Sequence, residues 1–138
     1  MPTEQPVPGP YIQDGRAEFL ARKESLEAAC RASGLEVRCI CFLRANATQA
    51  DLYAQGRSKP GRIVTNAKPG HSPHNYSLAA DYVVMIKGKP CWDVRRKEWR
   101  KFVQLVRYCY LTTGYDFAKL RDWGHVELLD WKDYVKWE

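Results

Sequence analysis

The chain has 138 residues, of which 45% are hydrophobic and 28% are charged, a composition that indicates one globular domain with a hydrophobic core. No apolar run approaches the roughly 20 residues of a membrane-spanning helix, so we expect no stable membrane insertion. The net charge of +6 fits an anionic partner such as a nucleic acid, an anionic lipid or a carboxylate-rich polymer. The lysines and arginines are scattered, and their densest cluster also carries the apolar positions of a helix, so we expect no nucleic-acid partner.

The first third of the chain predicts an arm, a helix and a strand. The proline-rich residues 1–13 have neither the basic nor the apolar region of a secretory signal, and we expect them to form a short extended arm. Asp14 is placed to cap a helix that ends near Ser33. Residues 35–43 alternate at first and then become apolar, which predicts a strand whose second half is buried on both faces.

The middle of the chain combines a long loop with a strong strand. Residues 47–56 predict a short helix, and the proline- and glycine-rich residues 57–77 predict a loop of a length that is usually functional in compact domains. Residues 78–86 predict a buried strand, and residues 87–90 a hairpin turn. Since no linker or repeat interrupts the remainder, we expect residues 14–138 to form a single domain.

The last third of the chain predicts a helix and a final strand. Residues 95–113 carry aromatic and aliphatic residues three and four positions apart, which predicts an amphipathic helix with its stop at Gly114. Another strand is predicted to begin at His125. Helices alternate with strands, but the hairpin makes part of the sheet antiparallel. We therefore predict an α+β fold, with a small, mainly antiparallel sheet flanked by helices.

The five cysteines predict no disulfide framework and no sulfur-ligated metal. Their number is odd, and no CxxC spacing occurs in the chain. We interpret them as small buried hydrophobic residues in a reducing compartment.

Two short segments concentrate residues that can bind a metal ion. In residues 70–85, His74 lies in the loop and Asp81 lies where the chain becomes apolar, where an unpaired carboxylate is costly to bury. A zinc ion with nitrogen and oxygen ligands would neutralise Asp81, and His125 is a candidate third ligand. Asp122 precedes His125 by three residues and could take the proton of a metal-bound water. A histidine and a nearby carboxylate more often form a hydrogen-bonded pair than a metal site. Only the second segment, with Asp122 and His125, makes the hypothesis of a metal site more specific.

Several segments of the chain, in the same order as in the family, resemble a known family. "SPHNYSLAADY" resembles the SxHxxGxAxD motif of the zinc peptidases that include the D-Ala-D-Ala carboxypeptidases, and "DWGHVE" resembles the second motif of that group. "FLRANATQADLYAQGR" and "KPGRIVTNAKPG" are similar to phage endolysins and bacterial autolysins that are L-alanyl-D-glutamate peptidases. The resemblance covers roughly residues 35–130 and implies a hedgehog/D-Ala-D-Ala peptidase-like fold.

The resemblance implies the main roles in the site. His74, Asp81 and His125 would bind Zn²⁺, and residues 14–138 would be a zinc peptidase catalytic domain. Asp122 would be the catalytic base. Arg44 would bind the substrate carbonyl and the developing oxyanion, a role that suits a fixed guanidinium group.

Other matching positions would contact the substrate or support the ligands. Ser72 would support the metal-binding loop, and Ser77 stands where the family usually has glycine. Glu127 would share a strand face with His125 and is a rival base, although the Asp-x-x-His spacing favours Asp122. The positions that match the cleft-lining helix and loop are Gln49, Gln55 and Arg57.

The sequence therefore predicts a zinc-dependent endolysin that hydrolyses the L-Ala–D-Glu bond in the stem peptides of peptidoglycan. Arg57 or Arg62 is expected to meet the D-glutamate carboxylate. We expect a monomer that is made in the host cytoplasm and reaches the wall after another protein permeabilises the membrane. The alternatives are a D-Ala-D-Ala carboxypeptidase with the same site, and a non-catalytic zinc-binding module similar to the hedgehog signalling domain.

Overall fold

The computed structural model describes residues 15–44 and 46–135. The predicted arm and the predicted cap, Asp14, lie outside the described residues. The α-helices are α1 (Gly15–Ala32), α2 (Asn46–Ala54) and α3 (Lys97–Tyr108). The 3-10 helices are η1 (Pro73–Tyr76), η2 (Gly114–Asp116) and η3 (Trp131–Tyr134). The strands are β1 (Val37–Cys41), β2 (Ala79–Ile86), β3 (Lys89–Cys91), β4 (Leu111–Thr113) and β5 (His125–Leu128).

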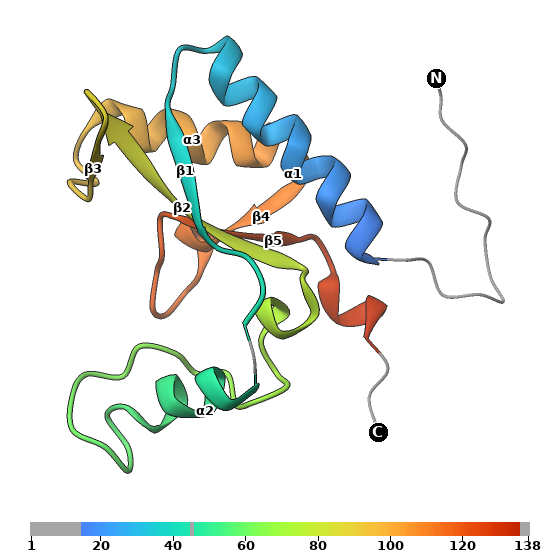
Figure 1. Ribbon diagram of the computed structural model, residues 1–138, viewed down its shortest axis with the longest axis vertical. Helices are drawn as coiled ribbons and strands as arrows, with labels where there is room; N and C mark the ends of the chain where they lie inside the picture. The colour runs from blue at the N-terminus through green and yellow to red at the C-terminus, as the bar shows by residue number, and fades with distance from the viewer. Residues whose placement is uncertain (1–14, 45, 136–138) are drawn as a thin grey trace, which may run out of the picture.

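The strands form one antiparallel sheet in the order β1-β2-β5-β4, and β3 pairs with β2. This arrangement confirms the predicted α+β class with a mainly antiparallel sheet (Figure 1). The predicted hairpin turn is also present, because Lys87 and Gly88 both adopt left-handed backbone angles, with φ of 52° and 77°. Two consecutive left-handed residues match the right-handed twist of the strands that they join.

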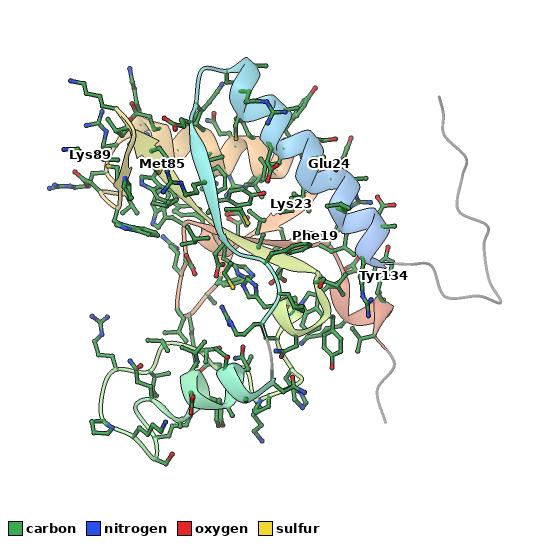
Figure 2. The ribbon with its side chains drawn as sticks, in the orientation of Figure 1. Phe19, Lys23, Glu24, Met85, Lys89 and Tyr134 are labelled. Atoms are coloured by element: carbon green, nitrogen blue, oxygen red, sulfur yellow. The ribbon has the colours of Figure 1, made fainter. Side chains whose placement is uncertain are left out.

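Helices α1 and α3 cover one face of the sheet, while α2 lies at the far end of the molecule (Figure 1). Phe19 points from α1 toward the sheet, and Glu24 points away from it (Figure 2). Tyr82 of β2 faces the helices: its ring lies 5.6 Å from that of Phe102, and its hydroxyl donates to Glu27 over 2.6 Å. Neighbouring side chains of a strand alternate between faces, so Asp81 points away from the helices.

The prediction that the second half of the first strand is buried on both faces is wrong. Ile40 is 50% exposed and Leu43 is 65% exposed. The reason is topological: β1 is an edge strand, with a neighbour only on the β2 side. Alternation within the strand cannot distinguish an edge from a central position.

The helix predicted over residues 95–113 is shorter than expected. It ends at Tyr108, Tyr110 adopts a left-handed φ of 60°, and the chain then forms β4 against β5. Thr112 and Thr113 are β-branched and favour a strand. Their pairing with β5 is a long-range contact that the helical spacing of the sequence does not indicate.

None of the helices in the described ranges has the length and apolarity that crossing a membrane requires.

Candidate active site

Three potential ligands lie in one row across the sheet. Asp81 of β2 pairs with Cys41 on β1 and with His125 on β5. Residues that lie directly opposite one another in an antiparallel pair project to the same face. All three therefore project from the face opposite the helices, where the sheet register brings together residues far apart in the sequence.

The short helix η1 places His74 over this row. Ser72 caps η1, because its Oγ accepts a hydrogen bond from the backbone N–H of His74 over 3.2 Å. Asn75 completes the capping box by accepting a hydrogen bond from the backbone N–H of Ser72. Ser77 then ends η1 with a left-handed φ of 60°, the conformation that glycine adopts most readily. The His74 side chain is held almost completely buried.

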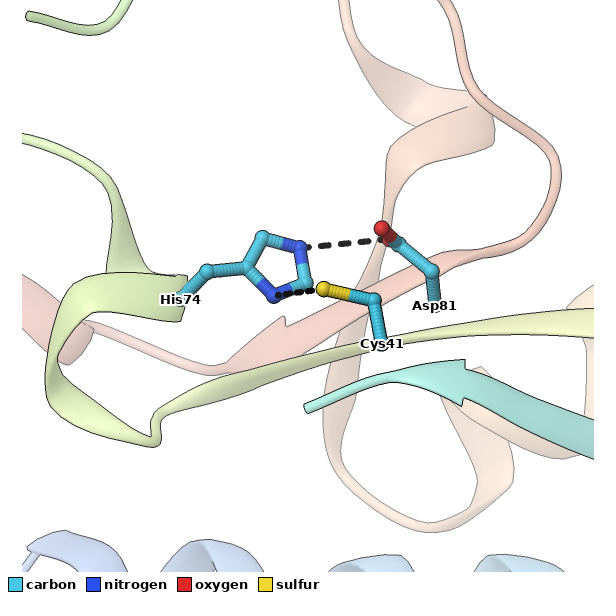
Figure 3. Close-up of side chains that lie close together, drawn as sticks. All are labelled: Cys41, His74 and Asp81. Carbon is cyan, nitrogen blue, oxygen red and sulfur yellow. Dashed lines mark hydrogen bonds and ion pairs between the residues drawn. The ribbon is translucent and has the colours of Figure 1, made fainter. Parts of the chain in front are cut away.

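Both histidines approach the same carboxylate oxygen. Asp81 Oδ1 lies 3.2 Å from His74 Nε2 and 3.1 Å from His125 Nδ1. Burial raises the pKa of Asp81, but the hydrogen bond of His125 and the close approach of the His74 ring lower it more, so the pKa lies well below its usual range. Asp81 is therefore an anion that lies beside two imidazole nitrogens. Figure 3 shows one nitrogen of the His74 ring facing Asp81 and the other facing Cys41, whose Sγ lies 3.8 Å from Nδ1.

The ring nitrogens that face away from Asp81 have their own partners. Nδ1 of His74 lies 3.4 Å from the carbonyl oxygen of Phe42, and Nε2 of His125 lies 2.8 Å from Glu127 Oε1. Burial lowers the pKa of His125, but its hydrogen bonds to Asp81 and Glu127 raise the pKa to about 9. In a metal-bound state, the outward nitrogen of each ring would keep its proton and the inward nitrogen would donate its lone pair, which is how metal-binding histidines are oriented.

A tight turn brings Asp122 next to this cluster. Its Oδ1 accepts a hydrogen bond from the backbone N–H of Gly124 over 3.1 Å. A Cβ atom on Gly114 would collide with the Asp122 carbonyl and lie 2.8 Å from the Cβ of His125, and one on Gly124 would collide with the Tyr82 carbonyl. Both glycines are thus required for the close approach of the turn to the sheet. Sequence reasoning treated Gly114 only as a helix stop.

The donor atoms fit a metal ion. Within residues 15–44 and 46–135, two groups have ligand atoms within 4.8 Å of one another. They are Cys41, His74 and Asp81, and Asp81, Asp122 and His125. The predicted ligands thus occur as overlapping groups that share Asp81. His74 Nε2 is completely buried and makes no hydrogen bond of good geometry. A buried nitrogen of this kind calls for another partner, and a metal ion is one that an imidazole nitrogen can bind.

Arg44 is held beside the cluster. Its Nη2 lies 3.5 Å from Asp81 Oδ2, and its Nη1 donates to Gln49 Oε1 over 2.9 Å. Gln49 is completely buried, and its Nε2 donates to the carbonyl oxygen of Ala67 over 2.7 Å. The Gln49 amide therefore connects the guanidinium group to the loop after α2.

Gln55 and Arg57, predicted on the cleft-lining helix and loop, contact the backbone of that loop. Gln55 Nε2 donates to the Arg62 carbonyl over 3.0 Å. The Arg57 guanidinium donates to the carbonyls of Tyr53 and Thr65 over 2.6 and 3.1 Å, and lies over the Tyr53 ring. Neither lines the cleft. Both brace the loop after α2, and Arg57 is not positioned to meet a substrate carboxylate.

A cleft of about 800 Å³ opens over the cluster. The floor of the cleft is formed by His74, Asp81 and His125. Its α2 wall is formed by Leu52 and residues 64–67, and its C-terminal wall by Phe117, Lys119 and Leu120. Phe117 lies 5.4 Å from the His125 ring, centroid to centroid. No residue of the C-terminal wall was predicted as a site residue, because the wall has no regular element and no motif.

A curated relative identifies the family. The chain is 32% identical over 114 residues to the peptidoglycan L-alanyl-D-glutamate endopeptidase CwlK of Bacillus subtilis (strain 168), an alignment that covers 77% of this chain and 68% of CwlK. The chain belongs to the peptidoglycan L-alanyl-D-glutamate endopeptidase family. No protein-family model matches it.

Solved structures support the same fold for this endopeptidase family member. The L-Ala D-Glu endopeptidase ChiX of Serratia marcescens has a TM-score of 0.65 at 19% identity, over 86% of this chain and 84% of ChiX. DacB of Streptococcus pneumoniae D39 has a TM-score of 0.57 at 17% identity, over 93% of this chain and 73% of DacB. These likenesses confirm the predicted D-Ala-D-Ala peptidase-like fold.

Proposed function

We propose that this protein is a zinc-dependent peptidoglycan endopeptidase that hydrolyses the L-Ala–D-Glu bond of the stem peptide. The observation that carries the proposal is the cluster on the cleft floor, where two histidines and Asp122 surround Asp81. The sequence relationship to CwlK supports the choice of bond. The floor supplies the chemistry of hydrolysis, and the walls supply the selection of substrate.

The proposed metal ligands are His74, Asp81 and His125. Imidazole nitrogens and a carboxylate oxygen are ligands that zinc prefers, and three protein ligands leave a position for water. Zinc, when bound, would polarise the scissile carbonyl and lower the pKa of that water. The low pKa of Asp81 supports the assignment, because the carboxylate is already an anion at neutral pH.

Asp122 is the proposed general base. Its carboxylate accepts one hydrogen bond from Gly124 and keeps further lone pairs for a water molecule. Its donor atom belongs to the same group as those of Asp81 and His125, so a water beside the floor is within its reach. Asp122 would take the proton from the attacking water and give it to the leaving amine.

Glu127 is better suited to orient His125 than to act as the base. It contacts the ring nitrogen of His125 that faces away from Asp81, at 2.8 Å. A carboxylate in that position fixes the tautomer and the ring orientation of a metal-binding histidine. The rival base from the sequence therefore receives a supporting role in this proposal.

Arg44 is proposed to stabilise the oxyanion. It lines the cleft beside Asp81, and the buried Gln49 fixes its position. A guanidinium group that is already in place when negative charge develops costs no reorganisation, and removal of such a donor typically slows catalysis about 100-fold or more.

We extend the proposal to a monomeric phage endolysin that reaches peptidoglycan from the host cytoplasm after another protein permeabilises the membrane. The similarity of residues 42–70 to endolysins supports this biological role. The net charge of +6 would favour adsorption to an anionic wall.

The test is to digest purified peptidoglycan and identify the products by mass spectrometry and end-group labelling. The proposal expects new amino-terminal glutamate, with L-Ala left on the glycan, and no such product from Asp122→Asn. Free D-Ala as the main product would indicate a carboxypeptidase instead. Metal binding without any product would indicate a non-catalytic zinc-binding module.

A further inference from the structure

Both ends of the C-terminal wall are hydrogen-bonded to the same backbone carbonyl. The carbonyl of Gly114 accepts hydrogen bonds from the N–H groups of Phe117 and Asp122, over 3.2 and 3.0 Å. The residues between these two anchors form a short excursion that starts beside His125 and ends at the proposed base. Within it, Leu120 adopts a left-handed φ of 53°, which costs a residue with a Cβ about 1–2 kcal/mol. Such outliers concentrate at functional sites.

The excursion carries two cations that have different surroundings. Lys119 is exposed, lines the cleft, and makes no hydrogen bond or ion pair with any residue that the structure describes. Arg121 does not line the cleft, and its guanidinium carbon lies 4.5 Å from the centre of the Tyr115 ring. One positive charge therefore faces the substrate space, while its neighbour is held on an aromatic ring outside it.

The other cations that line the cleft already have contacts. Arg44 donates to Gln49 and lies beside Asp81, and Lys132 lies 5.9 Å from the centre of the Trp131 ring. Among the described cleft residues, Lys119 is the cation without an assigned protein partner. A mobile ammonium group on an open wall is suited to bind a carboxylate that arrives with the substrate.

We propose that Lys119 binds the free carboxylate of the glutamate residue that follows the scissile bond, and that the enzyme therefore prefers glutamate over its amidated form. This inference rests on the proposed function. A glutamate within a peptide chain keeps one carboxylate outside its backbone amides. The carboxylate is only a few bonds from the scissile carbonyl, and the C-terminal wall that carries Lys119 adjoins the floor, where the Phe117 ring lies 5.4 Å from the His125 ring.

The test compares two synthetic peptides that differ only in this group, one with L-Ala–D-Glu and one with the free carboxylate converted to a carboxamide. The kcat/KM of the wild-type protein is expected to be about fivefold higher on the carboxylate peptide, the upper end of the range for an exposed charge pair. Lys119→Gln is expected to reduce the ratio to within about twofold. Arg121→Gln removes the same charge from the same excursion and is expected to keep the wild-type ratio.

The two kcat/KM values of each variant are measured on one preparation, so a change in the fraction of active protein cancels in their ratio. Equal cleavage of both peptides by the wild type, or an unchanged ratio in Lys119→Gln, would overturn this inference alone. Loss of the preference in Lys132→Gln, with Lys119→Gln unchanged, would also overturn it. Cleavage of neither peptide by the wild type would instead overturn the proposed function.

Discussion

The floor and the α2 wall of the cleft are built in different ways. On the floor, Asp81 and His125 lie on paired strands, where backbone hydrogen bonds set their separation. Among the described residues, the loop behind the α2 wall has one isolated bridge, between Gln55 and Lys59, and side-chain hydrogen bonds hold the wall in place. The buried amide of Gln49 connects the wall to the floor through Arg44.

This difference separates chemistry from substrate selection. A sheet holds reacting groups within a few tenths of an ångström, which hydrolysis requires. A wall held by side chains can rearrange without disturbing the floor. Substitutions on the floor should therefore abolish activity, whereas substitutions in the wall should reduce activity only in part.

The largest effect is expected from loss of a floor ligand. His125→Ala removes a nitrogen donor and should weaken metal binding by more than the roughly 10–100-fold that follows loss of a mere orienting partner. Metal content after dialysis, measured by mass spectrometry, checks this. Exposed His71 lines the cleft away from the described ligand groups, and His71→Ala should retain the metal. Loss of the metal in His71→Ala but not in His74→Ala would refute the ligand assignment.

The next effect distinguishes the base from the orienting carboxylate. Asp122→Asn should keep the fold and the metal but lower kcat roughly 100-fold or more, because the proton acceptor is removed. Glu127→Gln keeps an oxygen that can accept from His125, so its main effect should be a weaker metal affinity. Titration with a metal chelator and turnover measurements separate the two variants. Full turnover in Asp122→Asn combined with none in metal-loaded Glu127→Gln would exchange the roles.

A smaller effect is expected from the wall. Gln49→Ala removes the acceptor of Arg44 Nη1 and the side-chain donor to the Ala67 carbonyl, and should cost about 1–3 kcal/mol of stability. The kcat/KM should fall about tenfold, as the oxyanion donor loses its fixed position. Gln55→Ala is the matched control, because the side-chain hydrogen bond of Gln55 to the Arg62 carbonyl is exposed. This variant should change stability and kcat/KM little. Thermal unfolding and kinetics measure them, and equal losses in both variants would contradict the special role of Gln49.

The smallest effect concerns the loop that carries His74. Ser77→Gly removes a Cβ from a left-handed position and should leave stability unchanged or raise it by up to about 1 kcal/mol. Ser72→Ala removes the cap of the same helix and should lower stability by about 1 kcal/mol. Unfolding midpoints in denaturant report both changes. A large destabilisation by Ser77→Gly would show that the serine side chain makes a contact that the backbone argument omits.

The sequence was sufficient for the parts of the fold that depend on local patterns. The pattern around Asp81 and the motif at His125 predicted two strands, which prove to be neighbours in the sheet, and residues 87–90 predicted the hairpin turn that follows the first of them. The strand at Leu111 was missed because its stabilising contact is with β5, far along the chain.

The site could be predicted only where a motif existed. Cys41 joined the ligand row through strand register, which one sequence does not specify. The resemblance placed Arg57 near the substrate. Its actual contacts, hydrogen bonds to loop carbonyls, leave no pattern in the sequence and could not be predicted. For the same reason, Lys119 on the irregular C-terminal wall gave no signal.

We propose that the protein cleaves the L-Ala–D-Glu bond with one metal ion bound at the cleft floor. The most direct test is to titrate metal-free protein with zinc while following cleavage of a defined L-Ala–D-Glu peptide. We expect no cleavage without metal and a linear rise that saturates at one equivalent of zinc, with amino-terminal D-glutamate as the new end group. Full cleavage by the metal-free protein, or no cleavage at one bound equivalent, would contradict the account.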